Sequence, residues 1–231
     1  MTPSDPGAGA EPAPLLATKL HPPRRRRTLV ARPRLSDLAE RSRHRALTLV
    51  SAPAGFGKTT LVAEWIADAS ATAWLSLDLR DDDPTRFWTY VIAALETAVP
   101  DLRSGAASLI QTPGVPLDVV VATLINDLET ASHDLVLVLD DYHAIRSPEI
   151  HDSVAFLLDH LPPQIRIVIA TRADPPLPLA ALRADGELLE IRAADLRFTN
   201  DEARTYLADA MDLDLPAADV DVLEARTEGW I

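Results

Sequence analysis

The stretch from Leu47 to Ala67 constrains the fold most, because it joins three local patterns in a fixed order. An apolar run at 47–50 predicts a buried strand, and 61–67 predicts the start of a helix. The loop between them ends in Gly-Lys-Thr at 57–59. A glycine-containing loop that leads from a strand into a helix is the context that makes a phosphate-binding loop credible.

Each part of such a loop has a physical task. Glycines let successive backbone N–H groups point at one anion, and the following helix adds its unpaired N–H groups and the positive end of its dipole. Lys58 would add a charge for the β- and γ-phosphates, and Thr59 a hydroxyl for Mg²⁺. We therefore expect ten residues to bind the nucleotide phosphates: Ser51, Ala52, Pro53, Ala54, Gly55, Phe56, Gly57, Lys58, Thr59 and Thr60.

Ala52 departs from the usual pattern, Gly-x-x-x-x-Gly-Lys-Ser/Thr, which has glycine at its first position. Alanine costs little there if its φ is negative. The simpler interpretation is a chance Gly-Lys-Thr on an ordinary strand–helix turn. The strand before the loop and the helix after it favour the phosphate-binding interpretation.

Charged residues follow two further apolar runs. Asp140 and Asp141 follow the run at 135–139, and Arg172 comes soon after the run at 166–170. At the carboxyl edge of a parallel sheet, Asp140 would hold Mg²⁺, Asp141 would orient or activate a water, and Arg172 would sense the γ-phosphate. The alternatives are a polar turn for the two aspartates and a surface arginine at the end of a strand.

Alternation of apolar strands with helical periodicity predicts an α/β fold with a five-stranded parallel sheet. The strands are expected at 47–50, 73–78, 135–139, 166–170 and 188–191. The helices are expected at 37–44, from 61 to about 70, and at 85–99, 117–131, 148–161 and 177–184, with a long loop at 100–116. Helices without strands follow, from 200 and over 216–228.

This pattern divides the chain into three parts. We expect a disordered lead-in at 1–17, a P-loop NTPase domain at 18–198 and the start of a helical subdomain at 199–231. An apolar pattern begins at the last residues, 229–231, which suggests the N-terminal piece of a longer protein.

Composition excludes several classes of function. The net charge of −13 argues against direct binding of nucleic acid, and the basic run at 24–27 is interpreted as a solvated surface rather than as a localisation signal or nucleic-acid arm. There is no cysteine for a disulfide or a thiolate metal site. No secretory signal or membrane-length apolar run is visible, so we expect a cytoplasmic protein without a membrane partner.

The residues resemble a known family, the signal-transducing STAND NTPases, and in particular the large ATP-binding LuxR-type transcriptional regulators related to the activator of the maltose regulon. The resemblance runs from Thr18 to the end of the chain. It is carried by the matching stretches at 18–20, 29–35, 49–60, 74–78, 137–143, 170–172, 196–199 and 228–230. Ser-Ala-Pro-Ala-Gly at 51–55 is typical of that family.

The resemblance implies a switch, in which ADP holds a closed monomer and ATP with an inducer opens a self-associating form. It implies the roles given above for the phosphate loop, Asp140, Asp141 and Arg172, and it places Val30, Arg32 and Pro33 near the adenine. It also places the strand of Arg172 between the phosphate-loop strand and the strand of Asp140. The winged helix, the repeat sensor and the helix-turn-helix of the family do not occur in these residues, so DNA binding would need other domains.

Three interpretations of function remain. The first is the nucleotide switch, with slow ATP hydrolysis. The second is a P-loop kinase that acts on a small molecule, which would need an acceptor pocket and a basic lid. The third is an interaction module with a vestigial phosphate loop, against which the intact set of Lys58, Thr59, Asp140 and Asp141 argues. The guanine-reading motif Asn-Lys-x-Asp of GTPases is absent, which weakly favours adenine.

Overall fold

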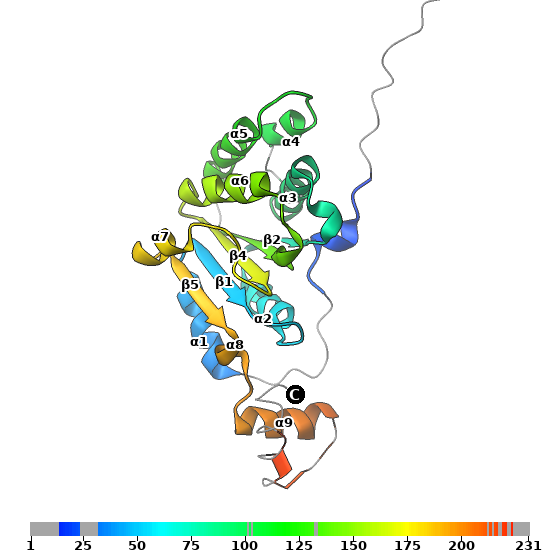
Figure 1. Cartoon of the computed structure of the whole chain (residues 1–231), viewed down its shortest axis with the longest axis vertical. Coiled ribbons are helices and arrows are strands. Elements are labelled where there is room, and N and C mark those ends of the chain that lie inside the picture. Colours follow the sequence, from blue (N-terminus) through cyan, green and yellow to red (C-terminus); the bar gives the residue numbers. More distant parts are fainter. Residues whose placement is uncertain are drawn as a thin grey trace, which may run out of the picture.

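A parallel sheet of five strands lies at the centre of the structure, a computed structural model that describes residues 14–23, 32–100, 102, 104–131, 134–211, 213, 215–216, 219–220 and 223 (Figure 1). The strands are β1 (Leu47–Ser51), β2 (Ala71–Ser76), β3 (Leu135–Asp140), β4 (Ile165–Thr171) and β5 (Leu188–Arg192). Their order is β2-β3-β4-β1-β5, and every pair of neighbours is parallel. The α/β fold is confirmed, and so is the position of β4 between the phosphate-loop strand and the strand of Asp140.

Strand register brings the predicted polar residues to one edge of the sheet. Ser51, the last residue of β1, lies beside Thr171 of β4, and Asp140, the last residue of β3, lies beside Ser76 of β2. Strands β1 and β3 are buried along their whole length, as expected when helices cover both faces of a parallel sheet.

Helices form a layer on each face of the sheet (Figure 1). One layer contains α3 (Pro84–Ala98), α4 (Gly105–Ile110), α5 (Leu117–Glu129) and α6 (Pro148–Asp159), and its core also includes residues of α7 (Leu179–Ala184). The other contains α1 (Pro33–Ser42), α2 (Lys58–Trp65) and α8 (Ala193–Leu196). Alternate strand residues supply the two cores: Leu137 and Leu139 pack into the first, and Val136 and Val138 into the second.

Single turns of 3₁₀ helix complete the domain: η1 (Ala17–Leu20), η2 (Ile66–Asp68), η3 (Leu79–Asp81) and η4 (Tyr142–Ala144). Turn η1 contacts the edge strand β2. Its Lys19 is buried and pairs with Asp81, which is also fully buried and bonds to Arg86. This network fixes the start of the described chain to the sheet edge and to α3.

Helix α9 (Asn200–Met211) follows the sheet domain. Thr199 caps it through a reciprocal pair of bonds, in which Glu202 N–H donates to the Thr199 hydroxyl and Thr199 N–H donates to the Glu202 carboxylate. The helix therefore begins at residue 200, as predicted, with Thr199 as its cap. Most of the second predicted helix, 216–228, and residues 1–13 of the predicted lead-in lie outside the described residues, so the three-part division stays a prediction.

Strand β2 begins and ends two residues before its predicted range, 73–78. Two predictions in helical regions were also wrong. The region 100–116 is not all loop, because α4 lies within it and buries Ala106 against α5. Helix α1 begins at Pro33 and not after Ser36, because a proline fits the first helical position, where its missing N–H costs nothing. In both cases packing or backbone geometry outweighed a weak local pattern.

Candidate phosphate-binding site at the carboxyl edge of the sheet

The loop between β1 and α2 has the backbone that a phosphate-binding loop needs. Gly55 and Gly57 have positive φ values of 87° and 72°, in the left-handed region that favours glycine. A Cβ at Gly57 would meet nothing within 4 Å, so its backbone conformation, and not lack of space, requires glycine there. Helix α2 starts directly afterwards, at Lys58, and directs its first N–H groups towards the loop.

The Lys58 side chain folds back and bonds to the start of the phosphate loop. Its Nζ donates to the carbonyl oxygens of Ala52 at 2.8 Å and of Pro53 at 2.9 Å, and the residue is only 6% exposed. Burial lowers the pKa of Lys58, an effect that Arg172 reinforces and Asp141 and Asp140 oppose. An ammonium group has three donors, and the two carbonyls accept two of them. The side chain is thus held where it can donate to an anion in the loop.

Thr59, at the start of α2, contacts Asp140, at the end of β3. The Thr59 hydroxyl donates to Asp140 Oδ1 at 2.9 Å, although the residues are 81 positions apart in the chain. Asp140 is 4% exposed. Burial, with a further contribution from the Asp141 charge, raises the pKa of Asp140 to about 6. The carboxylate is therefore placed where a nearby cation would stabilise its charged form.

These two side chains suit Mg²⁺ if other ligands complete its coordination. A hydroxyl and a carboxylate are oxygen ligands of the kind that Mg²⁺ prefers. Among the described residues, no group of three or more His, Cys, Asp or Glu side chains could hold a metal ion. A cation at this point would accordingly depend on phosphate oxygens and water for the rest of its coordination.

Asp141 and Arg172 flank this pair. Asp141 has φ 59° and ψ 38°, the left-handed conformation that only a few per cent of non-glycine residues adopt. Its side chain is about half exposed and lies 3.7 Å from His143, measured from Oδ1 to Nδ1. Arg172 is exposed just beyond the end of β4, and its charge acts on both Lys58 and His143. The structure therefore brings together Lys58, Thr59, Asp140, Asp141 and Arg172.

Arg32 lies elsewhere. Its Nη2 donates to the carbonyl oxygens of Leu196 and Arg197, at 2.6 and 2.9 Å, and its Nε pairs with Glu202 at 3.2 Å. Its guanidinium also stacks 4.6 Å from the centre of the Phe198 ring. The side chain thus binds the α8–α9 connection and not the phosphate loop. Of the two other residues expected near the adenine, Pro33 is the first residue of α1 and lines the cavity described next, and Val30 lies outside the described residues.

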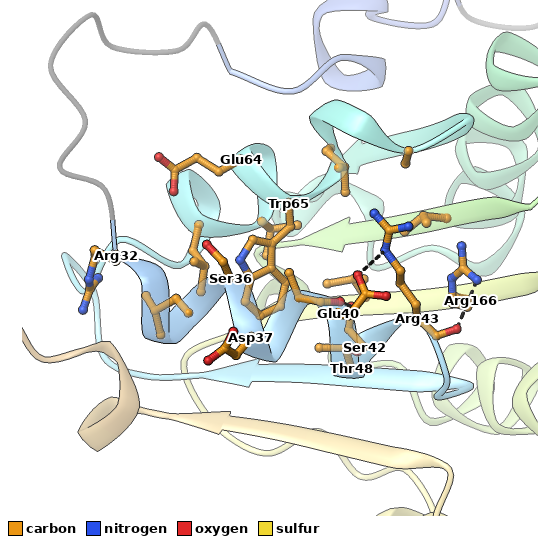
Figure 2. A pocket seen from close by; sticks show the side chains of 18 of the residues that line it. Arg32, Ser36, Asp37, Glu40, Ser42, Arg43, Thr48, Glu64, Trp65 and Arg166 are labelled. Atoms are coloured by element: carbon orange, nitrogen blue, oxygen red, sulfur yellow. Dashed lines mark hydrogen bonds and ion pairs between the residues drawn. The ribbon is translucent and has the colours of Figure 1, made fainter.

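A cavity of about 930 Å³ lies between α1, α2 and the sheet (Figure 2). Arg32, Leu61 and Glu64 line part of it, and Arg43 and Arg166 line another part, near the amino ends of the strands. Residues 53–60 do not line it, although Leu61 follows directly in the sequence. The cavity and the phosphate loop are therefore separate features, and the loop carries the argument for a nucleotide.

Two further contacts had weak or no signals in the sequence. Arg32 and Arg34 pair with Glu202, which lies 170 and 168 positions away in the chain. The local sequence indicates only the Thr-x-x-Glu cap around Glu202. Tyr142 is buried next to the two aspartates, and its hydroxyl forms a hydrogen bond with His151 Nδ1 at 3.0 Å. This bond attaches the turn that contains His143 to helix α6.

Comparison with known proteins agrees with the geometry. The chain is 36% identical over 217 residues to the HTH-type transcriptional regulator MalT of Yersinia enterocolitica, and 38% identical over 218 residues to MalT of Serratia proteamaculans. Each alignment covers 94% of this chain and 24% of the relative. The chain is a P-loop NTPase related to MalT. It spans about a quarter of the length of these regulators, and no family model matches it.

Solved structures support the fold. The Walker-type ATPase PABY2304 of Pyrococcus abyssi matches with a TM-score of 0.55 and 15% identity, over 93% of this chain and 68% of the other. Cdc6p of Pyrobaculum aerophilum matches with a TM-score of 0.55 and 18% identity, over 86% and 54% of the two chains. At these identities the likeness shows the fold, which is the parallel α/β architecture of P-loop ATPases.

Proposed function

We propose that this chain is an ATP-binding, slowly ATP-hydrolysing switch domain of a bacterial LuxR-type transcriptional regulator of the STAND class. The observation that supports it most is the bond between Thr59 and Asp140, because it joins the end of the phosphate loop to the acidic end of β3. A triphosphate in the loop would lie against Lys58, and its metal ion against Thr59 and Asp140.

The proposed chemistry is attack of water on the γ-phosphorus of ATP. A bond forms between the water oxygen and the γ-phosphorus as the bond from that phosphorus to the β,γ-bridging oxygen breaks and ADP leaves. One proton of the water passes to Asp141, and the other stays on the phosphate product. Mg²⁺, bound with the nucleotide, would neutralise charge on the phosphates. Lys58 and Arg172 supply positive charge around the γ-phosphate, and Arg172 thereby distinguishes ATP from ADP.

Regulation would use parts of the molecule beyond these residues. In the proposed switch, ADP holds a closed form, whereas ATP and an inducer favour self-association, and DNA is bound by other domains of the regulator. Among the described residues no helix is long and apolar enough to cross a membrane. We propose a cytoplasmic location on the strength of the regulator relatives. Residues 1–17, 18–198 and 199–231 keep their proposed roles as lead-in, NTPase domain and start of a helical subdomain.

The kinase alternative gains no support from the geometry. The segment 100–116 was the longest predicted loop, and its helix α4 packs on α5 and α3 in the layer that covers one face of the sheet. It therefore does not act as a lid over the phosphate loop.

Two variants test the proposal. Lys58→Ala should weaken ATP binding by at least ~100-fold in titration calorimetry, since more than one charged hydrogen bond to phosphate is lost. Arg166→Ala removes a cation near the amino end of β4 and serves as the control.

Asp141→Asn should keep ATP affinity and slow single-turnover hydrolysis by ~100-fold or more. Unchanged affinity in Lys58→Ala would end the proposal, and unchanged turnover in Asp141→Asn would remove the role of Asp141.

A further inference from the structure

His143 contains an unsatisfied polar atom beside the site. Its Nδ1 is buried and has no hydrogen-bond partner in the structure. Among the described residues, only one other side-chain nitrogen or oxygen shares this condition, the Thr72 hydroxyl on β2. Burying a polar group without a partner is unfavourable, and each such case in a folded protein calls for an explanation.

The surroundings of this atom point towards the proposed reaction. Nδ1 lies 3.7 Å from Asp141 Oδ1, just beyond hydrogen-bond distance. The charged groups that act on the ring are Asp141, Arg172 and Lys58, all of them at the carboxyl edge of the sheet. Burial is the main cause that lowers the pKa of His143, so the ring is held in its neutral form. A neutral imidazole can carry its single proton on Nδ1 and donate it.

The backbone fixes this ring more firmly than it fixes the carboxylate. His143 lies in the single turn η4, between the buried residues Tyr142 and Ala144. The bond from Tyr142 to His151 ties that turn to α6. Asp141 precedes the turn in a left-handed conformation, and its side chain is about half exposed. The less constrained partner of the pair is therefore the carboxylate.

We infer that His143 is a positioning residue: in the ATP-bound state its Nδ1–H donates to the Asp141 carboxylate and fixes the oxygen that orients the attacking water. A small rotation of the Asp141 side chain would shorten the 3.7 Å separation to a hydrogen bond and satisfy the buried nitrogen. His143 transfers no proton in this step. This inference rests on the proposed ATPase function and adds a residue to it.

Two substitutions distinguish the role of Nδ1 from that of Nε2. The amide nitrogen of asparagine can occupy the place of Nδ1, whereas that of glutamine reaches towards the place of Nε2. His143→Asn should therefore hydrolyse ATP within ~3-fold of wild type, and His143→Gln at least ~10-fold more slowly, the size of one lost charge-assisted hydrogen bond. Affinity for ATP should change by less than ~2-fold in both, because neither substitution removes a phosphate contact.

A double-mutant cycle tests whether His143 acts through Asp141. In the Asp141→Asn background, His143→Gln should slow single-turnover hydrolysis no further, since the carboxylate that it orients is gone. Equal rates in wild type and His143→Gln would overturn the inference, as would a full ~10-fold effect of His143→Gln in the Asp141→Asn background. Loss of ATP binding in both His143 variants would show a structural role and overturn it as well.

The outcome for the wild-type chain separates this inference from the proposed function. A wild type that binds ATP, loses binding with Lys58→Ala and hydrolyses nothing would remove the role of His143 while leaving a nucleotide-binding switch. A wild type that does not bind ATP would remove the proposed function itself.

Discussion

At the scale of single residues, Asp140 combines burial with a charge that the metal site needs. Its pKa of about 6 lies above the ordinary value of 3.8, mainly because burial penalises the charged form. The folded state therefore keeps this proton up to about pH 6, whereas the unfolded state loses it near pH 4. The free energy of unfolding should accordingly fall by roughly 3 kcal/mol as the pH rises through this window.

Asp140→Asn tests that account. Without nucleotide, this variant should be more stable than wild type at pH 8 and should lose the fall in stability between pH 4 and 6, as followed by urea denaturation at several pH values. Asparagine retains an oxygen that can accept from the Thr59 hydroxyl. Asp159→Asn, a change at an exposed position at the end of α6, is the matched control. A wild type without extra loss of stability in this window would contradict the assigned burial of Asp140.

Gly57 offers a second test at this scale, because Gly114 is a matched control. Both have positive φ, 72° and 81°, and a Cβ at either position would meet nothing within 4 Å. Alanine at either site should cost about 1–2 kcal/mol, or roughly 2–8 °C in melting temperature. Only Gly57→Ala should also weaken ATP binding by ~10-fold or more, because only its backbone belongs to the phosphate loop. Equal ATP affinity in both variants would contradict the assignment of the loop.

At the scale of elements, α9 is attached to the sheet domain by Arg32 and Arg34. Glu202 accepts from both guanidinium groups and is itself one-tenth exposed at its side chain. Burial works to raise its pKa, but the bonds from Arg34 and Thr199 N–H and the charges of the two arginines lower it overall. A carboxylate with these partners should contribute to holding α9 in place.

Glu202→Gln should release α9 locally. Loss of the charged bonds to Arg32 and Arg34 should lower the local stability of α9 by roughly 1–3 kcal/mol. Hydrogen exchange in 200–211 should then quicken while exchange in β1 and β3 stays unchanged. Asp201→Asn is the control, since the Asp201 side chain is 94% exposed and, within the part of the chain that the structure describes, pairs with Arg204 alone, at 3.6 Å. Equal exchange in the two variants would show that the arginine contacts do not hold the helix.

How far the sequence predicts an element depends on whether its signal is local. Strands β3 and β4 were predicted to within one residue at each end, because a continuous apolar run that ends at a charged or polar residue has one simple explanation in an α/β fold. Strand β2 was placed two residues too late, because Leu77 and Asp78 continue the alternation, whereas Asp78 in fact caps η3. Helix α4 was missed because its few apolar residues become informative only against α5.

The same reasoning separates what could and could not be predicted in the site. Lys58, Thr59, Asp140, Asp141 and Arg172 stand at the ends of strands or in a recognisable loop, so their placement at one edge followed from the sheet. The left-handed backbone at Asp141, the unpaired Nδ1 of His143 and the pairing of Arg32 with Glu202 depend on contacts between distant segments. Residue type and spacing carry no information about such contacts.

At the scale of the whole molecule, binding of ATP with Mg²⁺ should stabilise the fold. At a ligand concentration a hundred times the Kd, mass action adds ~2.7 kcal/mol, or roughly 5–11 °C in melting temperature for a chain of this size. Differential scanning fluorimetry should show this rise in wild type and in Arg166→Ala. Removal of the metal with a chelator should reduce it, and Lys58→Ala should abolish it. A rise of the same size in Lys58→Ala would place the nucleotide outside the phosphate loop.

The central claim is that the loop after β1 and the acidic end of β3 share one nucleotide and its metal ion. A crystal structure with a non-hydrolysable ATP analogue and Mn²⁺ tests it most directly, because anomalous scattering locates the metal independently of the nucleotide. We expect the Mn²⁺ peak next to the Thr59 hydroxyl and the Asp140 carboxylate, with the γ-phosphate against Lys58. An analogue bound in the cavity between α1 and α2, or a metal peak away from Asp140, would contradict the account.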